Sequence, residues 1–186
     1  MLPMHYLPRI QITKMDIGRH LQYFYTSRRQ IKSEIKMSIV TEPEYDEFFA
    51  AVNEASANVT WCALATIHNG APKVRMVHPT WEGDVLWIAT GATTAKAKQL
   101  ASNPLVDIQY QVAPPNFVHV MVSGTAELLA DPATREHVWK VMDYDLNDFW
   151  PEGPSTEDFV AIKITPNRVE LSEMFGTVNK RVWRRQ

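Results

Sequence analysis

Residues 59–90 read VTWCALATIHNGAPKVRMVHPTWEGDVLWIAT. This stretch gives the clearest structural signal in the chain, because apolar, β-branched segments alternate with short turn sequences. Asn69-Gly70 accepts the positive φ angles of a tight hairpin, and Glu82-Gly83-Asp84 supplies a second turn. Such short connections join antiparallel strands. The three strands predicted here span 59–67, 73–81 and 85–90.

Helical signals flank this stretch on both sides. Thr41 and Glu44 have the spacing of a capping box, and an apolar i, i+3, i+4, i+7 face (Tyr45, Phe48, Phe49, Val52) predicts a helix ending near Ser56. After Gly91, a hydroxyl of Thr93 or Thr94 can cap a helix that runs to about Ser102. Asp131-Pro132 opens a third helix, which continues to about Met142. Three further strands are predicted over 105–112, 117–129 and 159–171.

Six strands with short connections and three helices predict a mainly β protein: a six-stranded antiparallel split β-barrel with peripheral helices. The length of 186 residues fits one domain, and 45% hydrophobic residues are enough for a substantial core. A single cysteine excludes an intrachain disulfide framework and a cysteine-based structural zinc site. No apolar run approaches the roughly 18 residues that a membrane span needs.

The net charge of −2 conceals two unlike segments. Residues 1–36 carry seven Lys/Arg against two Asp/Glu, a balance of +5, and residues 37–186 carry twelve against nineteen, a balance of −7. We therefore expect a basic, flexible N-terminal extension over 1–36 and one domain over 37–186. An organellar transit peptide and a nucleic-acid-binding arm are alternative interpretations of the extension. It contains no secretory apolar segment and no nucleic-acid docking motif, so we expect a cytoplasmic protein without nucleic-acid or membrane partners.

The start of the helix after Gly91 is the strongest candidate for a binding site. First helical turns favour acidic residues, whereas GATTAKAKQL places Lys96 and Lys98 there and no acid. Threonine hydroxyls, free backbone N–H groups and a lysine form a credible phosphate pocket. Arg75 supplies a planar fork suited to the same anion, and the Glu82-Gly83-Asp84 hairpin is expected to make its strand a neighbour of the strand that leads to Lys96.

Other chemistry-bearing residues have weaker patterns. His78 and His119 lack partners at metal-ligand spacing, so we expect structural histidines and no metal site. Cys62 lies among apolar residues and is expected to be a buried, inert thiol. The aspartates at 143, 145 and 148 lack the glycine and terminal glutamate of an EF-hand and are interpreted as a solvated loop. No residue is assigned as a catalytic acid or base.

The order of segments resembles the FMN-binding split-barrel superfamily of pyridoxamine 5′-phosphate oxidase, and within it the general stress protein branch. The resemblance covers roughly residues 41–172 and rests on six segments in family order. These segments are Val74–Pro79, Leu86–Thr90, Thr93–Lys96, Asn103–Val106, Val120–Ala126 and Asp148–Pro154.

The resemblance implies a homodimer that holds two FMN molecules at its subunit interface. It assigns the FMN phosphate to Arg75 and Lys96, assisted by a hydroxyl of Thr93 or Thr94. It further implies that the backbone of Met76, Val77 and His78 runs along the flavin ring, that Thr90 lies beside the ribityl-phosphate chain, that His119 points toward the flavin, and that Trp150 forms a wall of the pocket.

The C-terminal segment departs from the oxidase. Glu170-Leu171-Ser172-Glu173 stands where the oxidase continues into the segment that grips its vitamer, so oxidation of pyridoxamine phosphate is not expected. The leading hypothesis is an FMN-dependent oxidoreductase acting with a small-molecule substrate or an electron donor such as NAD(P)H. A flavin-binding module without turnover is an alternative. F420 remains open as the cofactor, and a haem-binding split barrel would need His78 or His119 near the pocket.

Overall fold

The structure is a computed structural model that describes residues 37–57, 59–110, 112, 114–115 and 117–186. The predictions for the basic extension over 1–36 lie outside these residues. The part of the chain from residue 37 onward belongs to one compact unit. Within the described ranges, no helix combines the length and the apolar character that crossing a membrane would require.

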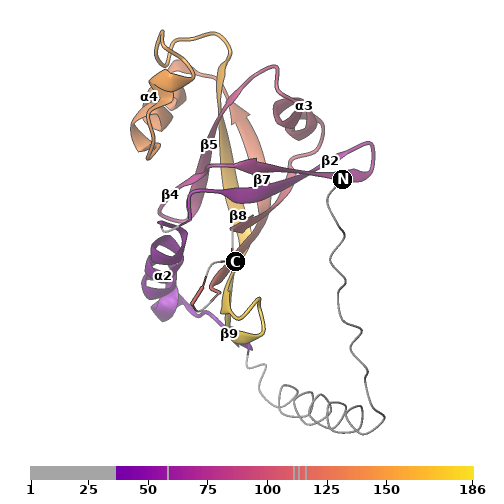
Figure 1. Ribbon diagram of the computed structural model, residues 1–186, viewed down its shortest axis with the longest axis vertical. Helices are drawn as coiled ribbons and strands as arrows, with labels where there is room; N and C mark the ends of the chain where they lie inside the picture. The colour runs from indigo at the N-terminus through magenta and orange to yellow at the C-terminus, as the bar shows by residue number, and fades with distance from the viewer. Residues whose placement is uncertain (1–36, 58, 111, 113, 116) are drawn as a thin grey trace, which may run out of the picture. The chain divides into compact units, whose positions relative to one another are not determined.

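The described residues fold around one large β-sheet with helices at its periphery (Figure 1). Its strands are β1 (Met37–Ile39), β2 (Cys62–His68), β3 (Ala71–Val77), β4 (Thr80–Glu82), β5 (Val85–Gly91), β6 (Leu105–Tyr110), β7 (His119–Leu129), β8 (Phe159–Glu173) and β9 (Val178–Arg184). The helices are η1 (Glu42–Glu44), α2 (Tyr45–Ala57), α3 (Ala95–Ser102), α4 (Pro132–Val141) and η2 (Leu146–Asp148).

The strands follow the order β1-β9-β8-β7-β6-β2-β3, and β5 joins β8 to β4 outside this path. Every pairing is antiparallel except that of β1 with β9. The 15-residue strand β8 pairs with β5, β7 and β9, so it connects the two parts of the sheet. This mainly β arrangement with peripheral helices confirms the predicted fold class.

The predicted number of six strands is wrong, because the described residues already form nine in this sheet. The single return strand expected over 73–81 is divided at His78-Pro79 into β3 and β4. Proline has no N–H to donate to a ladder, which explains the interruption. The strands β1 and β9 were not predicted. β1 has three residues, all exposed, and β9 mixes basic residues with only two buried ones, so neither has a clear alternating pattern.

Local signals placed the helices and the main turn. Asn69 (φ 52°) and Gly70 (φ 75°) occupy the left-handed region, as the Asn-Gly hairpin requires. The backbone N–H of Thr41 donates to Glu44 Oε2 at 2.9 Å, which confirms that half of the capping box before α2. The apolar face of α2 is buried, and Phe49 packs edge-on against Trp183 of β9 with ring centroids 5.1 Å apart.

Two apolar clusters form the core. The larger one lies within the sheet and under α2 and contains fully buried Phe48, Leu64 and Ile162. The smaller one lies under α4 and is built around Trp87, Phe159 and η2. The strand β5 contributes to both clusters, through Ile88 to the larger one and through Trp87 to the smaller one.

Candidate functional site

A hydrogen-bonded network joins β2, β3 and α3. Arg75 donates from Nη1 to Thr66 Oγ1 at 2.6 Å and from Nη2 to Gln99 Oε1 at 2.5 Å. Thr66 Oγ1 in turn donates to Gln99 Oε1 at 2.6 Å. The carbonyl of Leu64 also accepts from Arg75, at 3.3 Å. All these acceptors are uncharged, so the network positions the guanidinium and leaves its charge uncompensated.

Lys96 lies close to this guanidinium. Its side chain is half-buried, and burial together with the nearby Arg75 charge lowers the pKa of the Lys96 amine. Among the residues that the structure describes, no carboxylate lies within 4.0 Å of the charged nitrogens of Arg75 or Lys96. Two neighbouring cations without an acidic partner favour an anionic ligand, because an anion relieves their mutual repulsion.

The first turn of α3 adds backbone donors to these cations. Thr94 is the N-cap, and its Oγ1 accepts from the backbone N–H of Ala97 at 3.4 Å. The buried Thr90 lies behind it, with the two hydroxyl oxygens 3.2 Å apart. The N–H groups of Ala95 and Lys96 belong to the first turn, which has no acceptors within the helix. The N-terminal end of α3 therefore has the N–H donors and the dipole direction that a phosphate requires.

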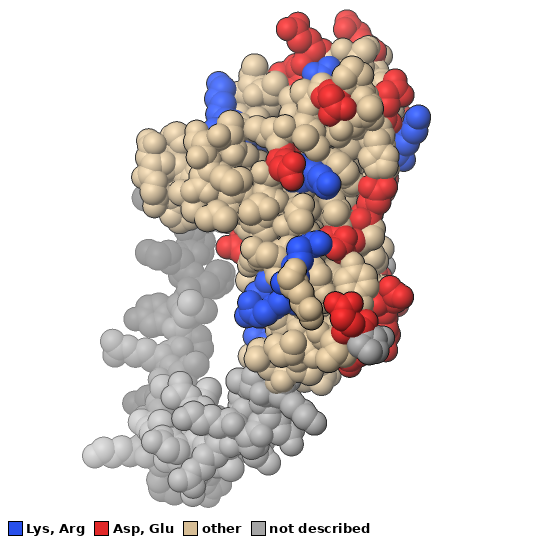
Figure 2. Space-filling view, turned by 180° about the vertical axis from the view of Figure 1, so that it is seen from behind, with Lys and Arg blue, Asp and Glu red and all other residues tan. Residues whose placement is uncertain are grey.

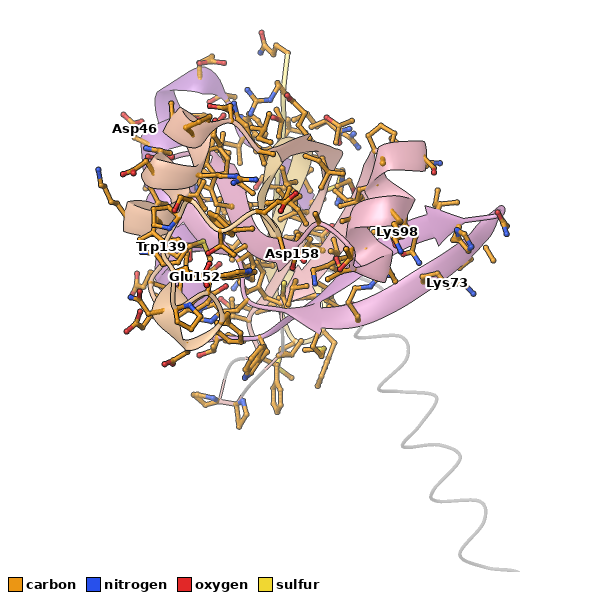
Figure 3. The ribbon with its side chains drawn as sticks, turned by 90° about the horizontal axis from the view of Figure 1, so that it is seen from above. Asp46, Lys73, Lys98, Trp139, Glu152 and Asp158 are labelled. Atoms are coloured by element: carbon orange, nitrogen blue, oxygen red, sulfur yellow. The ribbon has the colours of Figure 1, made fainter. Side chains whose placement is uncertain are left out.

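Thr93 has a different position from Thr94. It is exposed, and both its backbone N–H (3.4 Å) and its hydroxyl (3.5 Å) lie near Asp158 Oδ1. Figure 3 shows Asp158 close to the beginning of α3, while Lys98 lies further along the helix, where it is exposed. Of the two threonines that the sequence offered as alternatives, Thr94 therefore caps the helix and Thr93 faces a carboxylate.

A cavity of about 430 Å³ adjoins Lys96. Its size lies within the 300–1,000 Å³ that small-molecule sites usually have. Met76, Val77 and His78 line it, as do Ile88 and Ala89 of β5. Three aromatic residues from two loops complete its wall: Trp61, Tyr144 and Phe149.

The aromatic wall includes a stacked pair. The rings of His78 and Tyr144 have centroids 4.4 Å apart and planes inclined by 25°. Trp61 also contacts the imidazole, in a tilted arrangement with 5.9 Å between ring centroids. Trp61 and Phe149 are more than half exposed, at 53% and 65%. Flat apolar surfaces of this kind are suited to a planar ring system.

A carboxylate orients His78. Nε2 of His78 lies 2.9 Å from Asp143 Oδ1, and the same oxygen accepts from Thr80 Oγ1 at 2.8 Å. The interpretation of the 143–148 aspartates as a solvated loop is therefore incomplete. Asp143 is paired with the histidine, and Asp145 and Asp148 line the cavity. Within the described ranges, no group of three or more His, Cys, Asp or Glu residues is placed to hold a metal ion.

Six of the ten residues expected near the cofactor do not line this cavity: Arg75, Thr90, Thr93, Thr94, His119 and Trp150. Trp150 packs on Phe159 in the smaller core, with ring centroids 5.0 Å apart, and the neighbouring Phe149 takes the place in the wall. His119 lies at the start of β7 near Glu170 and Lys180. Both its ring nitrogens are buried and have no hydrogen-bond partner among the described residues, and burial lowers its pKa.

The network and the wall contain residues that the sequence analysis did not select. Thr66 and Gln99 are polar residues at buried positions of β2 and α3. The sequence contains a single indication for Gln99, namely that it follows Lys96 by three residues on the same predicted helix. Trp61, Tyr144 and Phe149 come from loops, where no periodic pattern indicates the direction of a side chain.

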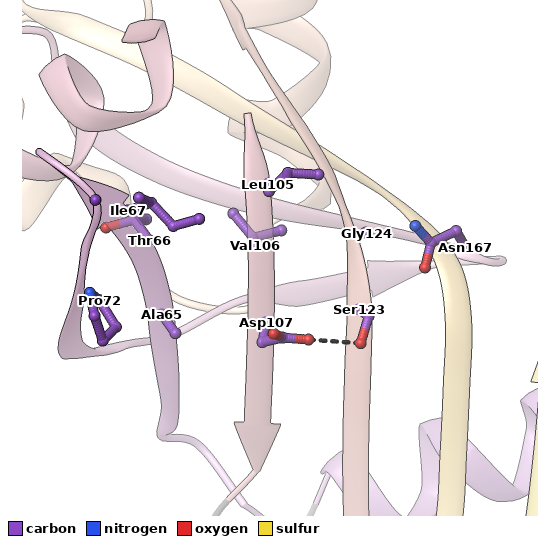
Figure 4. A pocket seen from close by; sticks show the side chains of 11 residues that line it. Ala65, Thr66, Ile67, Pro72, Leu105, Val106, Asp107, Ser123, Gly124 and Asn167 are labelled. Atoms are coloured by element: carbon purple, nitrogen blue, oxygen red, sulfur yellow. Dashed lines mark hydrogen bonds between the residues drawn. The ribbon is translucent and has the colours of Figure 1, made fainter. Parts of the chain in front are cut away.

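A second cavity, of about 420 Å³, lies over β2, β6 and β7 (Figure 4). Its one charged lining residue, Asp107, accepts a hydrogen bond from Ser123 Oγ at 2.5 Å. It lacks cations, histidine and aromatic walls, so its chemistry does not match that of the site at Lys96.

Comparison with solved structures shows which proteins share this fold. General Stress Protein 26 from Bacillus anthracis str. Sterne is 19% identical, with a TM-score of 0.60 over 76% of this chain and 99% of the other. A protein from Clostridium acetobutylicum related to general stress protein 26 is 21% identical, with a TM-score of 0.61 over 74% and 94%. An FAD-binding protein from Mesorhizobium loti is 22% identical, with a TM-score of 0.51 over 70% and 92%.

The family comparison adds a sequence-level match. Comparison with curated proteins finds no similar chain. Residues 37–173, by contrast, match the family described as pyridoxamine 5′-phosphate oxidase, and this range contains Arg75, Lys96, the aromatic cavity and eight of the nine strands that the structure describes. The match spans well over half of the 186 residues, and the chain therefore belongs to the pyridoxamine 5′-phosphate oxidase family.

Proposed function

We propose that this protein binds FMN and is an oxidoreductase that uses it. The observation that carries the proposal is the pair formed by Arg75 and Lys96: two neighbouring cations without a described acidic partner, at the start of a helix and beside an aromatic cavity. A flavin mononucleotide combines one phosphate with one planar ring, which is the combination that this surface accommodates. The FAD-binding protein of the same fold supports a flavin as the ligand class.

The described residues fit this cofactor. Arg75, Lys96 and the first N–H groups of α3 would hold the phosphate, and Thr94 with Thr90 behind it would lie beside the chain that leads to the ring. Met76, His78 and the aromatic wall would enclose the ring. FMN would supply hydride transfer, and the protein would position the cofactor, exclude water and set the polarity around the ring.

We also propose a homodimer, and the exposed apolar surface beside the cavity supports it. On β3, Val74 is 66% exposed and Met76 is 55% exposed, and Trp61, in the loop just before β2, is also exposed. Figure 2 shows that the projecting β2–β3 hairpin carries little charge on the face in view. A second subunit covering this surface would remove it from water. His119 does not line the cavity of its own subunit, and we propose that its role toward the flavin is exerted across the dimer interface.

The absorption spectrum of the purified protein tests the proposal. We expect a flavin spectrum that survives gel filtration after incubation with FMN, in a particle with the mass of a dimer. A colourless protein that takes up no FMN at micromolar concentration would contradict the proposal. Uptake of F420 but not of FMN would mean that the cofactor is F420. Reduction by NADH or NADPH followed by turnover with a quinone distinguishes an enzyme from a flavin-binding module.

A further inference from the structure

A polar cavity of about 340 Å³ lies behind the aromatic one. It is enclosed by the end of α2, by β4 and β6 and by the loop after α4. Six polar or aromatic residues on its wall matter here: Ser56, Thr60, His78, Trp81, Tyr110 and Asp143. His78 lines both cavities and is therefore part of the partition between them.

Tyr110 carries an unsatisfied hydroxyl on this wall. The residue is 3% exposed and its hydroxyl oxygen is buried; Ser56 and Trp81 are the polar groups that interact with it, but neither makes a hydrogen bond of good geometry to it. Burial raises the pKa of Tyr110 well above its usual value, so the phenol stays protonated. Ser56 beside it is already engaged, because it donates to Val52 O at 2.7 Å and accepts from Trp81 Nε1 at 3.2 Å. A buried phenol in a roomy polar cavity indicates ordered water as its partner.

Asp143 occupies one ring nitrogen of His78 and leaves the other one free. Nε2 of His78 lies 2.9 Å from Asp143 Oδ1, and because an ionised carboxylate can only accept, this contact favours a proton on Nε2. Among the described residues the one polar partner of the ring is Asp143, at Nε2, so Nδ1 is the nitrogen left to exchange a proton. The ring orientation is also fixed by stacking on Tyr144.

We propose that His78 is the proton donor of the aromatic cavity and that water held against Tyr110 in the polar cavity resupplies it. This inference rests on the proposed function. Bound FMN would supply a hydride, which is two electrons and one proton, and a neutral quinone that receives it would become a hydroquinone monoanion. The Nδ1–H of the His78 imidazolium gives its proton to the anionic oxygen, and the neutral imidazole regains a proton that the water relays from bulk solvent. NAD(P)H restores the reduced cofactor.

The charged and titratable groups around His78 come from three elements. The loop after α4 contributes the carboxylates of Asp143, Asp145 and Asp148 and the phenol of Tyr144. The helix α3 contributes the amine of Lys96, and β6 contributes Tyr110 across the polar cavity. Of these groups, Asp143 alone is hydrogen-bonded to the imidazole within the described residues, so it is the positioning residue to test.

The first test measures the imidazole directly, in cofactor-free protein, by the ¹⁵N chemical shifts of its two nitrogens. We expect His78 to be in the Nε2–H form and Asp143→Asn to give a mixture of tautomers. His137 is a matched reference, since its Nε2 lies 2.9 Å from Glu82 Oε2 and it lines neither cavity. An Nδ1–H tautomer of His78 in the wild-type protein would overturn the orientation on which the proposal depends.

The second test follows oxidation of the FMN-loaded, reduced protein by menadione in a stopped-flow instrument. General acid catalysis contributes about 10²–10⁴-fold, so we expect His78→Gln to slow the reaction at least tenfold and Asp143→Asn and Tyr110→Phe to slow it less. The pH dependence and the solvent isotope effect of the wild type should diminish in His78→Gln, and His137→Gln should resemble the wild type. Normal FMN loading with an unchanged oxidation rate in His78→Gln would overturn this inference alone. Failure of the wild-type protein to load FMN would overturn the proposed function.

Discussion

The guanidinium of Arg75 on β3 donates a 2.5 Å hydrogen bond from Nη2 to Oε1 of Gln99 on α3. The strands β4 and β5 separate these two elements in the chain. Thr66 of β2 is the third member, because it accepts from Arg75 and donates to Gln99. The side-chain amide of Gln99 is neutral, so it positions the guanidinium of Arg75 without neutralising its positive charge. The pair therefore fixes the geometry of the anion site while leaving its electrostatic attraction available to a ligand.

Replacing Gln99 with glutamate tests this relationship. In Gln99→Glu a carboxylate would take the position of the amide and neutralise Arg75, so we expect FMN affinity to fall at least tenfold without loss of stability in the cofactor-free protein. Quenching of flavin fluorescence measures the affinity, and urea unfolding measures the stability. Gln186→Glu adds the same charge at an exposed position and should leave both unchanged. Undiminished affinity in Gln99→Glu would show that the phosphate is held elsewhere.

Removing either cation should weaken FMN binding directly. Hydrogen bonds to charged groups contribute about 1.5–3 kcal/mol, so Arg75→Ala and Lys96→Ala should each raise the dissociation constant by roughly ten- to a hundredfold. The loss should shrink as salt concentration rises, because both are electrostatic contacts. Lys98→Ala removes an exposed lysine from the same helix and is the matched control. Unchanged affinity in both cation variants would contradict the proposed site.

Local sequence signals predicted most of the elements of the fold. The Asn69-Gly70 hairpin and the apolar face of α2 depend on contacts within a few residues, which the sequence shows directly. The pairing of β9 with β8 joins two strands across the 174–177 turn, and its basic residues hide the alternation. The proximity of Arg75 and Lys96 was expected through the 82–84 hairpin, but α3 packing on β2 produces it instead.

The residues around the candidate cavity were harder to predict than the phosphate end. Lys96 stood out because a lysine without an acid in the first turn of a helix opposes the helix dipole. Tyr144 and Phe149 had no such local anomaly, since their role follows from how the loop after α4 folds over His78. Trp150 illustrates the difficulty. Trp150 was expected in the cavity wall, but the preceding residue Phe149 lies there and Trp150 packs in the core.

The single cysteine should be chemically silent in the folded protein. Cys62 is fully buried on β2, and burial raises the pKa of its thiol to about 12. The thiolate is the reactive form, so at pH 8 almost none is present and reagents have no access. We expect no reaction with Ellman's reagent in native protein and one equivalent after unfolding in guanidinium chloride. Rapid labelling of the native protein would contradict both the burial and the pKa.

A buried ion-pair group on β8 predicts how stability depends on pH. Glu170 is 5% exposed and contacts Arg168 Nη2 at 2.5 Å and Lys180 Nζ at 2.9 Å. Burial alone would raise the pKa of Glu170, but the hydrogen bonds from Arg168 and Lys180 outweigh it and lower the pKa below the ordinary 4.5. The stabilisation that Glu170 gives is therefore fully present above about pH 4.5 and is lost as pH falls through the lower value of the folded state.

Glu170→Gln should consequently lower the free energy of unfolding by about 3 kcal/mol at pH 7, because it leaves Arg168 and Lys180 without their carboxylate. The difference from the wild type should shrink as the pH falls below 4.5, where the wild-type carboxyl becomes protonated as well. Urea unfolding at pH 7, 5 and 3.5 measures it. Glu47→Gln breaks a 3.4 Å pair with Arg181 in which the glutamate is 78% exposed, so it should cost at most about 0.5 kcal/mol. A penalty for Glu170→Gln that is equal at all three pH values would mean that the lost interaction is packing and not charge.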